Sequence, residues 1–310
     1  MPEPNRILVI KLSALGDFVQ VMGAAAAVRA FHRGARITLL TTAPYAELGR
    51  QAPYFDEVWV DRRPGWADPA GIWRLRRRLR EGRFDRVYDF QTRLRSSLYF
   101  WLMHEGGRPE WSGIAAGASH PHGNPDRDVM HTLDRQDDQL RMAGIPGPSP
   151  LPDLSWAAAD ISRFALPPDY VLLIPGGAAH RPAKRWPAEN YAALAARIAA
   201  AGLVPVVIGG ADERALGRII AAAAPSTRDL IGQTGYGDIV ALGAGARRAI
   251  GNDTGPMHLA VAGGAAATVL YSAASDPALT APRGPDVVIL RRDRLADLSA
   301  ETVAATLGLA

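Results

Sequence analysis

The chain of 310 residues contains no cysteine, which excludes disulfide bonds, thiolate metal sites and a cysteine nucleophile. No apolar run reaches the ~18 residues that a membrane-spanning helix needs. No small-residue cleavage site follows the apolar run RILVIKL at 6–12, so we predict no signal peptide. The G-x-x-x-x-G-K-[ST] pattern is absent as well, which disfavours a P-loop ATPase. Together these absences favour a cytoplasmic protein of another class.

Arginine is unevenly distributed along this chain, whose formal net charge is +4. The stretches RLRRRLREGR (74–83) and TRLRSS (92–97) both lie in the first half. Clustered arginines suit phosphate-bearing partners, namely nucleic acid, an anionic lipid surface or a phosphorylated sugar. A solvated helix face explains 74–83 equally well, because arginines on several faces of one helix cannot all contact one ligand.

Short β-branched segments alternate with helical segments along most of the chain, which is typical of a parallel sheet. The proline-rich stretch 146–156 interrupts the alternation and predicts a linker. We therefore expect two doubly wound α/β domains, at 1–157 and 158–310, with the last helix free to return to the first domain. Strands are expected at 6–12, 37–42, 57–61, 86–90, 170–177, 204–210, 229–233, 247–253, 266–272 and 287–292, and helices at 17–32 and 186–202 among others.

The stretch GNDTGPMHLA (251–260) concentrates polar side chains between an expected strand and an expected helix. Asp253-Thr254-Gly255 matches the Asp-Thr-Gly of aspartic proteases, but a pepsin-like enzyme needs two such turns on an all-β scaffold. In a parallel α/β sheet this segment lies at the carboxyl edge of the strands, where ligands bind. Thr254 can cap the helix, and the backbone amides of its first turn favour an anion. An ordinary capped helix with a buried His258 is the competing interpretation.

Two further loops follow strands in the same way. IKLSALGDFVQ (10–20) places Gly16 and Asp17 at the start of the first helix, where an aspartate can also be a simple cap or dipole partner. PGGAAHRPAKRWPAENY (175–191) presents Lys184 after a glycine-rich turn, and a lysine beside glycine amides suits a diphosphate.

These segments resemble, in order, the motifs of glycosyltransferase family 9, the heptosyltransferase family. The first loop resembles K-x-S-x-x-G-D, beginning at Lys11. YDFQTRLRSS (88–97) resembles D-x-Q-x-x-x-(R/K)-S, and HTLDRQ (131–136) resembles H-x-x-x-R. Lys184 opens K-x-W-P, VVIGGADE supplies a Gly-Gly turn before an acidic residue, and Asp253 opens D-[ST]-G-x-x-H. Each motif is weak alone, but six in the right order, spread over most of the chain, are specific for the family.

The resemblance implies the GT-B architecture, with two Rossmann-like domains facing across a cleft that closes to assemble the site. It implies inverting transfer of a heptose or related sugar from an ADP-sugar to a lipopolysaccharide core or similar glycan, with Asp17 as the general base. The donor would be held by backbone amides and charge, through Gly16, Gly177, Lys184, Gly209, Glu213, Asp253, Thr254, Gly255 and His258. The acceptor would contact Ser13, Gln91, Arg93, Arg95, His131 and Arg135.

The nucleotide sugar is then a co-substrate, and neither a cofactor nor a metal is expected. The acceptor is an anionic glycolipid or phosphorylated glycan, which allows peripheral contact with the cytoplasmic face of the inner membrane; no nucleic acid is expected. Asp126-Arg127-Asp128 looks like a D-x-D metal motif but lies away from any strand end, so we interpret it as a surface loop. In the loop before Lys184, residues 178–180 read Ala-Ala-His, where family members often carry hydroxyl residues.

Two alternative functions stay open. One is another GT-B nucleotide-sugar enzyme with a different donor or acceptor. The other is a non-catalytic nucleotide-binding or nucleic-acid-binding protein that uses the basic face. The latter predicts tolerance of Asp17→Ala and a nucleic-acid affinity that falls steeply with salt.

Overall fold

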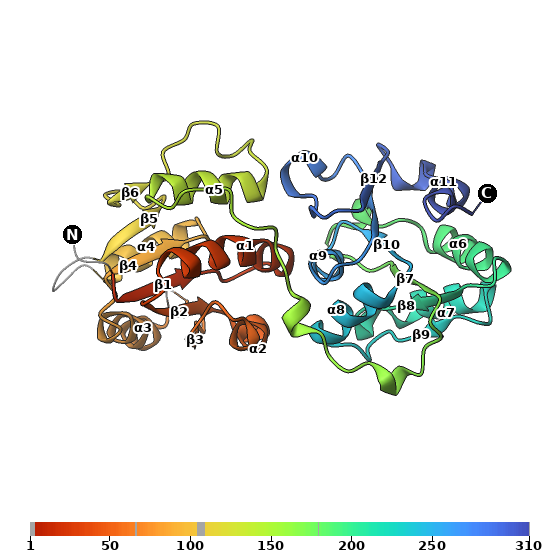
Figure 1. Ribbon diagram of the computed structural model, residues 1–310, viewed down its shortest axis with the longest axis horizontal. Helices are drawn as coiled ribbons and strands as arrows, with labels where there is room; N and C mark the ends of the chain where they lie inside the picture. The colour runs from red at the N-terminus through yellow and green to blue at the C-terminus, as the bar shows by residue number, and fades with distance from the viewer. Residues whose placement is uncertain (1–3, 66, 104–108, 179, 310) are drawn as a thin grey trace. The chain divides into compact units, whose positions relative to one another are not determined.

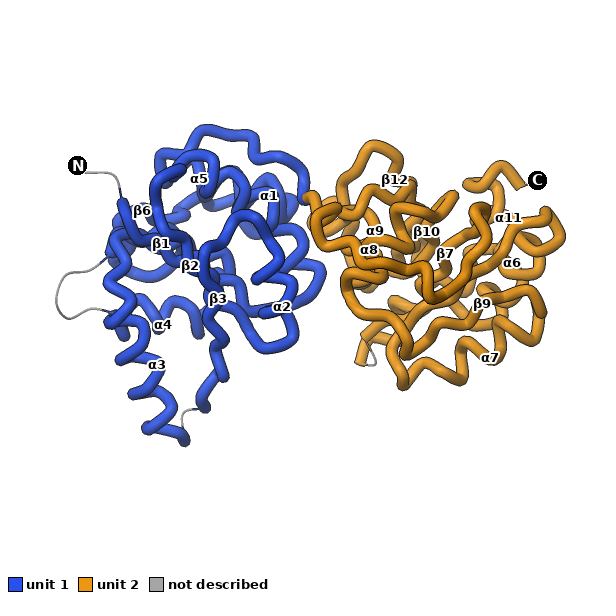
Figure 2. The backbone as a smooth tube through the Cα atoms, turned by 60° about the horizontal axis from the view of Figure 1, so that its bottom comes forward, with its two compact units in different colours: residues 1–152 blue, residues 153–310 orange. Residues whose placement is uncertain are grey.

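The computed structural model describes residues 4–65, 67–103, 109–178 and 180–309. The chain forms two compact units, Met1–Pro152 and Asp153–Ala310 (Figure 2). Within the described residues each unit contains one six-stranded sheet, and every strand pair in both sheets is parallel. Helices flank the two sheets (Figure 1). The expected α/β class, with two Rossmann-like doubly wound domains, is confirmed.

The first sheet has the strand order β3-β2-β1-β4-β5-β6. The chain runs outward from β1 to β3 and then returns to the other side of β1, as in a doubly wound fold. The strands are β1 (Arg6–Ile10), β2 (Arg36–Thr41), β3 (Glu57–Val60), β4 (Arg86–Asp89), β5 (Glu110–Gly113) and β6 (His120–Pro121). The helices are α1 (Leu15–Phe31), α2 (Ala43–Gln51), α3 (Pro69–Glu81), α4 (Leu94–Leu102) and α5 (Thr132–Met142).

Alternate residues of the strands in the first unit pack on opposite faces of the sheet. Val87 of β4 joins a buried cluster with Leu79 of α3 and Phe100 of α4. Its neighbour Tyr88 bonds instead to His32 at the end of α1, with 2.8 Å between the hydroxyl and Nε2. Because successive side chains of a strand point to opposite faces, α3 and α4 cover one face and α1 the other. Helix α5 packs beside α1.

The second sheet has the order β12-β11-β10-β7-β8-β9. Its strands are β7 (Tyr170–Ile174), β8 (Val204–Val207), β9 (Arg228–Asp229), β10 (Arg248–Asn252), β11 (Ala267–Tyr271) and β12 (Val287–Arg291). Its helices are α6 (Ala188–Ala200), α7 (Arg214–Ala223), α8 (Tyr236–Gly245), α9 (Gly255–Ala262), α10 (Pro277–Thr280) and α11 (Ala300–Ala305). Short 3-10 turns are η1 (Ser155–Ala157), η2 (Ser162–Phe164), η3 (Pro182–Lys184), η4 (Ala211–Glu213) and η5 (Leu295–Asp297).

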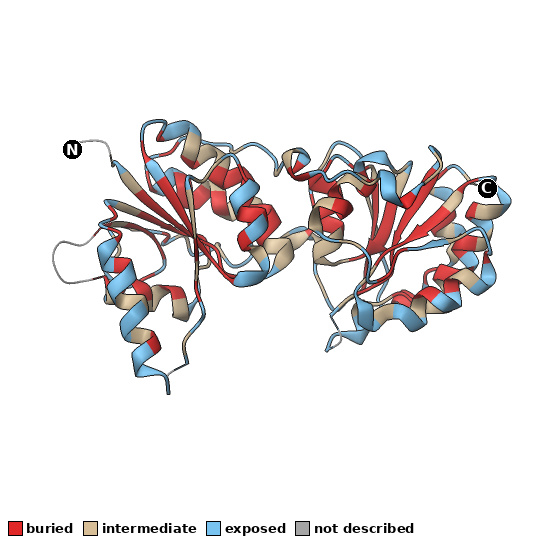
Figure 3. Ribbon diagram, turned by 90° about the horizontal axis from the view of Figure 1, so that it is seen from below, coloured by how far each residue is buried: buried red, intermediate tan, exposed pale blue. Residues whose placement is uncertain are grey.

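The last helix, α11, packs within the second unit. Val303 and Ala304 are fully buried in the same cluster as Tyr191 and Leu194 of α6. The second unit also begins earlier than the expected 158, because Leu154 N donates to Ala262 O at the end of α9 and η1 packs on α8. Figure 3 shows the buried residues concentrated in the strands and in the inner faces of the helices.

Several expected elements differ from those observed. Strands β5 and β6 were not expected, because their sequences EWSG and HP contain no apolar run. The expected strand 229–233 is reduced to Arg228–Asp229, because Gly232 adopts a positive φ of 75°. Helix α1 begins at Leu15, before Asp17. In the part of the chain that the structure describes, no helix is both long enough and apolar enough to cross a bilayer.

Candidate functional site

In the first unit the polar residues gather where β1 and β4 end. Asp17 lies in the first turn of α1, and its Oδ2 accepts a hydrogen bond from Ala14 N at 3.2 Å. Gly16 is in the same turn, so this residue of the predicted donor set belongs to the first unit together with Asp17. Asp17 is half-buried, which leaves part of its carboxylate in contact with solvent.

Two cations act on Asp17. Lys11 is buried, with 5% of its surface exposed, and its Nζ donates to Phe90 O at 3.2 Å. Burial lowers the pKa of Lys11, whereas the charge of Asp17 raises it. The pKa of Arg135 on α5 is likewise lowered by burial and by Arg127, with Asp17 acting in the opposite direction. The structure therefore brings the predicted base together with Lys11 and Arg135.

Gln91 and Asp89 stabilise the loops that follow β1 and β4, next to Asp17. Gln91 Oε1 accepts hydrogen bonds from Leu12 N at 2.8 Å and from Ser13 N at 3.1 Å, so it holds the loop that leads to Asp17. Asp89 is fully buried and its Oδ1 accepts from the backbone N of Gln91 and Thr92. Burial raises the pKa of Asp89 to about 6, against hydrogen bonds and the charge of Lys11 that lower it.

The other predicted acceptor residues have different surroundings. Arg93 is exposed at the N-cap of α4. Arg95 Nη1 donates to Pro64 O at 3.3 Å, which ties α4 to the loop after β3. His131 is buried at the N-cap of α5, and its Nδ1 accepts from Leu133 N at 3.1 Å. These bonds show that Gln91, Arg95 and His131 support the loops of the first unit, and their contact with an acceptor stays a prediction.

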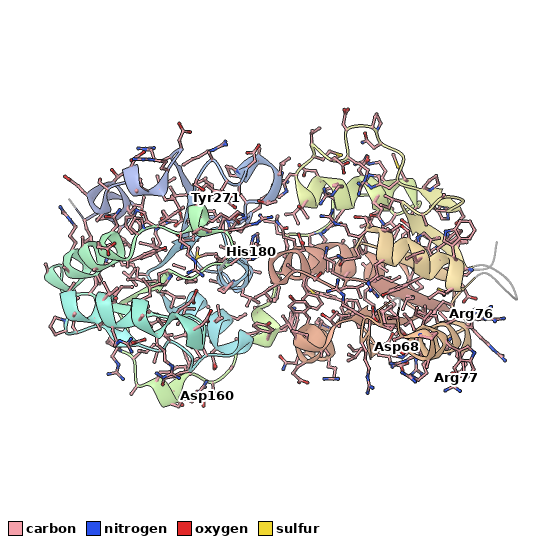
Figure 4. All side chains as sticks on the ribbon, turned by 180° about the vertical axis from the view of Figure 1, so that it is seen from behind. Asp68, Arg76, Arg77, Asp160, His180 and Tyr271 are labelled. Atoms are coloured by element: carbon pink, nitrogen blue, oxygen red, sulfur yellow. The ribbon has the colours of Figure 1, made fainter. Side chains whose placement is uncertain are left out.

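In the second unit, Lys184 and Asp253 form a tight ion pair. The distance between Lys184 Nζ and Asp253 Oδ2 is 2.5 Å, and the two side chains are 14% and 8% exposed. The hydroxyl of Tyr271 donates to Asp253 Oδ1 at 3.1 Å. Burial and the charge of Asp253 raise the pKa of Tyr271, so it remains a neutral donor; Tyr271 is marked in Figure 4. With both carboxylate oxygens occupied, Asp253 is suited to orienting Lys184.

Asn252 connects three segments around this ion pair. It is fully buried at the end of β10, and its Nδ2 donates to Pro175 O at 2.7 Å and to Gly176 O at 3.1 Å. Its Oδ1 accepts from Trp186 N at 3.0 Å and from the hydroxyl of Tyr191 at 3.1 Å. The side chain thus fixes the loop after β7 and the loop that carries Lys184 next to Asp253.

Glu213 joins the loops after β7 and β8. Its Oε1 accepts from Gly177 N at 3.0 Å and its Oε2 from Gly210 N at 2.9 Å. A Cβ at Gly176 or at Gly209 would lie 2.4 or 2.5 Å from the Glu213 carboxylate. A side chain at 176 or 209 would therefore force the Glu213 carboxylate to move, so glycine at these positions keeps its bonds to both loops in place.

Helix α9 begins with the expected D-T-G-x-x-H segment. Thr254 is the N-cap residue, but its hydroxyl makes no capping hydrogen bond, so the expectation that this side chain caps the helix is wrong. Thr254 Oγ1 is instead buried without a hydrogen-bond partner among the described residues. Gly255 is the first residue of the helix, and His258 is buried in its first turn. A buried hydroxyl beside the first amides of a helix is available to an anion.

The loop after β6 shows no metal-like arrangement. Asp126 and Asp128 are exposed, and Arg127 pairs with Asp128 at 2.7 Å. His122 is buried and its Nε2 lies 3.0 Å from Asp138 Oδ2. Across the described parts of the chain, no group of three or more histidine, aspartate or glutamate residues is arranged to hold a metal ion. Of the departures from the family pattern at 178–180, Ala179 lies outside the described residues.

Sequence reasoning missed Asn252 and Tyr271, and it gave no separate role to Lys11 or Asp89. Asn252 was visible as the residue before Asp253 at a strand end. Tyr271 carried no local signal, because only the pairing of β10 with β11 brings it to Asp253.

Comparison with known proteins gives the family. The model of glycosyltransferase family 9 (heptosyltransferase) matches residues 72–306. Lipopolysaccharide heptosyltransferase 2 of Salmonella typhimurium is 28% identical over 92% of this chain and 88% of its own, and the Escherichia coli protein of the same name is 26% identical over the same shares.

Solved structures share the fold over nearly the whole chain. ADP-heptose lps heptosyltransferase II of E. coli superposes with a TM-score of 0.80 at 24% identity, covering 98% of this chain and 97% of its own. A glycosyl transferase family 9 protein of Veillonella parvula gives a TM-score of 0.86 at 21% identity, covering 98% and 96%. These matches confirm the resemblance inferred from the motifs: the chain is a glycosyltransferase and belongs to glycosyltransferase family 9.

Proposed function

We propose that this enzyme transfers a heptose from an ADP-linked donor to a lipopolysaccharide core acceptor, with inversion at the anomeric carbon. Two curated relatives over most of the chain are named lipopolysaccharide heptosyltransferase 2, and a structural relative is named for ADP-heptose. The observation that carries the proposal is the arrangement of the second unit, where an ion-paired lysine follows β7 and a buried hydroxyl without a partner among the described residues follows β10.

The second unit is proposed to hold the diphosphate of the donor. Lys184 supplies a positive charge whose direction Asp253 and Tyr271 fix. The amides at the start of α9 and the Thr254 hydroxyl supply neutral donors beside it. Donors that are already oriented stabilise the charge that develops on the leaving nucleotide, because they need not reorganise during the reaction. Asp253 itself repels an anion, so we assign it to positioning Lys184 and not to contact with phosphate.

The first unit is proposed to activate the acceptor. Asp17 takes the proton of the acceptor hydroxyl while that oxygen attacks the anomeric carbon. The bond from this carbon to the diphosphate oxygen breaks, and ADP leaves with the electron pair. A single displacement of this kind inverts the configuration. Lys11 and Arg135 place positive charge near Asp17 on the side of the first unit.

Release of free nucleotide tests the proposal. The purified chain is incubated with ADP-, UDP- and GDP-linked sugars, with and without a heptose-deficient core acceptor. We expect acceptor-dependent release of ADP from ADP-heptose, together with a product heavier by one heptose in mass spectrometry. If nucleotide is released only from a UDP-sugar, the proposed ADP-linked donor is wrong. If product forms only on a different acceptor, the proposed acceptor is wrong.

A further inference from the structure

Helices α3 and α4 expose large apolar side chains on the face that they turn away from the sheet. Trp73 is 55% exposed, Leu94 76% and Trp101 49%. Leu94, half-buried Leu98 and Trp101 are spaced i, i+4 and i+7, so they form one stripe along α4. Helices α3 and α4 pack against each other and share a core on the same face of the first sheet. We call the exposed residues of α3, of α4 and of the segments 62–65 and 67–68 the α3–α4 surface.

The α3–α4 surface is also basic. Carboxylates neutralise part of it, since Arg74 pairs with Asp68 at 4.0 Å and Arg77 with Glu81 at 3.6 Å. Arg77 also lies over the ring of Trp73, 4.9 Å from its centroid; Figure 4 marks Arg76 and Arg77 on α3 and Asp68 at its N-cap. Among the described residues of this surface, exposed arginines still outnumber the exposed acids Asp68 and Glu81. These arginines are Arg62, Arg63, Arg74, Arg77, Arg78 and Arg80.

We propose that the α3–α4 surface docks the enzyme onto an anionic lipid bilayer. Tryptophan and leucine enter the boundary between headgroups and acyl chains, while long arginine side chains reach the lipid phosphates. The excess of arginines attracts anionic headgroups, and each basic residue near such a surface adds to binding. A neutral protein partner would explain the apolar stripe but not the arginines around it, and nucleic acid would explain the arginines but not exposed Leu94.

The position of the surface fits a lipid-linked acceptor. Helix α4 starts just after Gln91, which holds the loop leading to Asp17. Leu94 therefore lies at the carboxyl edge of the first sheet, the edge that carries Asp17. A bilayer in contact with Leu94 brings its headgroup layer to that edge. This step rests on the proposed acceptor, whereas the charge and apolar character of the surface do not.

Vesicle flotation of the full chain tests the inference without any substrate. One set of vesicles contains phosphatidylcholine and phosphatidylglycerol at about 2:1 and the other phosphatidylcholine alone. The test variant is W73S/L94S/W101S. The control variant, V129S/M142S/I219S, removes the same number of exposed apolar side chains from other surfaces, where these residues are 72%, 41% and 43% exposed. Thermal unfolding of each variant verifies that it is folded.

We expect the wild type and the control to float with the anionic vesicles, and salt to weaken this binding. The test variant should lose at least about tenfold in partition coefficient, because three inserted apolar groups are removed. Equal vesicle binding by the test and control variants would overturn the proposal. Equal binding of the wild type to anionic and to phosphatidylcholine vesicles would overturn it as well. Saturable binding of a single-stranded oligonucleotide, with no vesicle binding, would assign the surface to nucleic acid instead.

A water-soluble acceptor fragment separates this inference from the proposed function. The test variant should transfer sugar to the fragment at the wild-type rate, yet lose activity on acceptor embedded in vesicles. If the wild type binds vesicles but transfers no sugar, the docking surface is supported and the proposed reaction is wrong. Equal activity of the test variant on the free and the embedded acceptor would remove the docking surface alone.

Discussion

Asp17 follows the first strand of its sheet and is held by one backbone amide, with Lys11 and Arg135 acting on it through their charges. Asp253 follows a strand of the other sheet and has Lys184 Nζ at 2.5 Å and the Tyr271 hydroxyl at 3.1 Å. A carboxylate held by one amide has room to accept a proton, whereas one held on both oxygens can only position its partners. The carboxyl edges of two similar parallel sheets, after β1 in one and after β10 in the other, thus support two different tasks.

The largest expected effect comes from Asp17. In Asp17→Asn, the amide oxygen can still accept from Ala14 N, but it is a poor base. Turnover should fall by about 10²–10⁴-fold, the usual contribution of general acid–base catalysis, while ADP affinity stays unchanged. Initial rates and calorimetric titration with ADP measure the two quantities. A near-normal rate would leave Asp17 as a helix cap, and the contrast with Asp253 would disappear.

Replacing Asp253 should damage stability instead. Asp253→Asn leaves the charge of Lys184 buried without its partner, which typically costs about 3–5 kcal/mol in the free energy of unfolding. Asp17→Asn should cost less than about 1 kcal/mol, because the asparagine oxygen can still accept the hydrogen bond from Ala14 N. Urea denaturation of both variants gives the comparison. The double variant K184M/D253N should recover part of the loss, and similar stabilities for the two single variants would contradict the assignment.

Asp89 is a third carboxylate at a strand end, and its effect on stability should depend on pH. Its pKa is raised to about 6 in the folded protein, above its usual value of about 3.9, so the folded state holds the proton more tightly than the unfolded state. The contribution of Asp89 to the stability of the folded protein is therefore most favourable below about pH 4, and it becomes unfavourable as the pH rises through 6. Relative to wild type, Asp89→Asn should gain about 2–3 kcal/mol of stability between pH 4 and 7.5. A difference that does not change with pH would refute this.

Lys184 should govern nucleotide affinity. A charge-assisted contact is worth about 1.5–3 kcal/mol, so Lys184→Ala should weaken ADP binding by roughly 10- to 100-fold. His258→Ala should act in the same direction. Arg181→Ala, an exposed cation in the same loop, is the control and should bind nearly normally. In Lys184→Ala, ADP could bind more weakly because Lys184 no longer attracts it or because the unpaired Asp253 repels it; the double variant K184A/D253N distinguishes the two causes. Unchanged ADP affinity in every variant would show that the diphosphate binds at another site.

The smallest effect is expected at Thr254. Its buried hydroxyl has no partner among the described residues, so Thr254→Val should leave stability unchanged or raise it by up to about 1 kcal/mol. If the hydroxyl serves the donor, ADP affinity should still fall by about 0.5–1.5 kcal/mol, and Thr254→Ser should restore it. Calorimetry on both variants decides this. A loss of stability in Thr254→Val would indicate a structural hydrogen bond instead.

The sequence predicted the strands that form the two sheet centres, because β-branched runs such as RILVI and ATVLY are buried on both faces. It did not predict β5 or β6, whose short polar sequences become strands only by pairing at the sheet edge. Motif order singled out Asp17, Lys184 and Asp253, and the structure shows the ion pair between Lys184 and Asp253. The bonds of Asn252 and Tyr271 could not be predicted, since they depend on contacts between segments distant in the chain.

The α3–α4 surface has a kinetic consequence. An enzyme that stays on a bilayer between turnovers meets its acceptor by lateral diffusion, so the relevant concentration is the number of acceptor molecules per unit of membrane area. Adding inert lipid at a constant total amount of acceptor should then slow transfer, although the bulk acceptor concentration is unchanged. For W73S/L94S/W101S, which should meet the same vesicles from solution, the rate should be lower and nearly independent of added phosphatidylcholine.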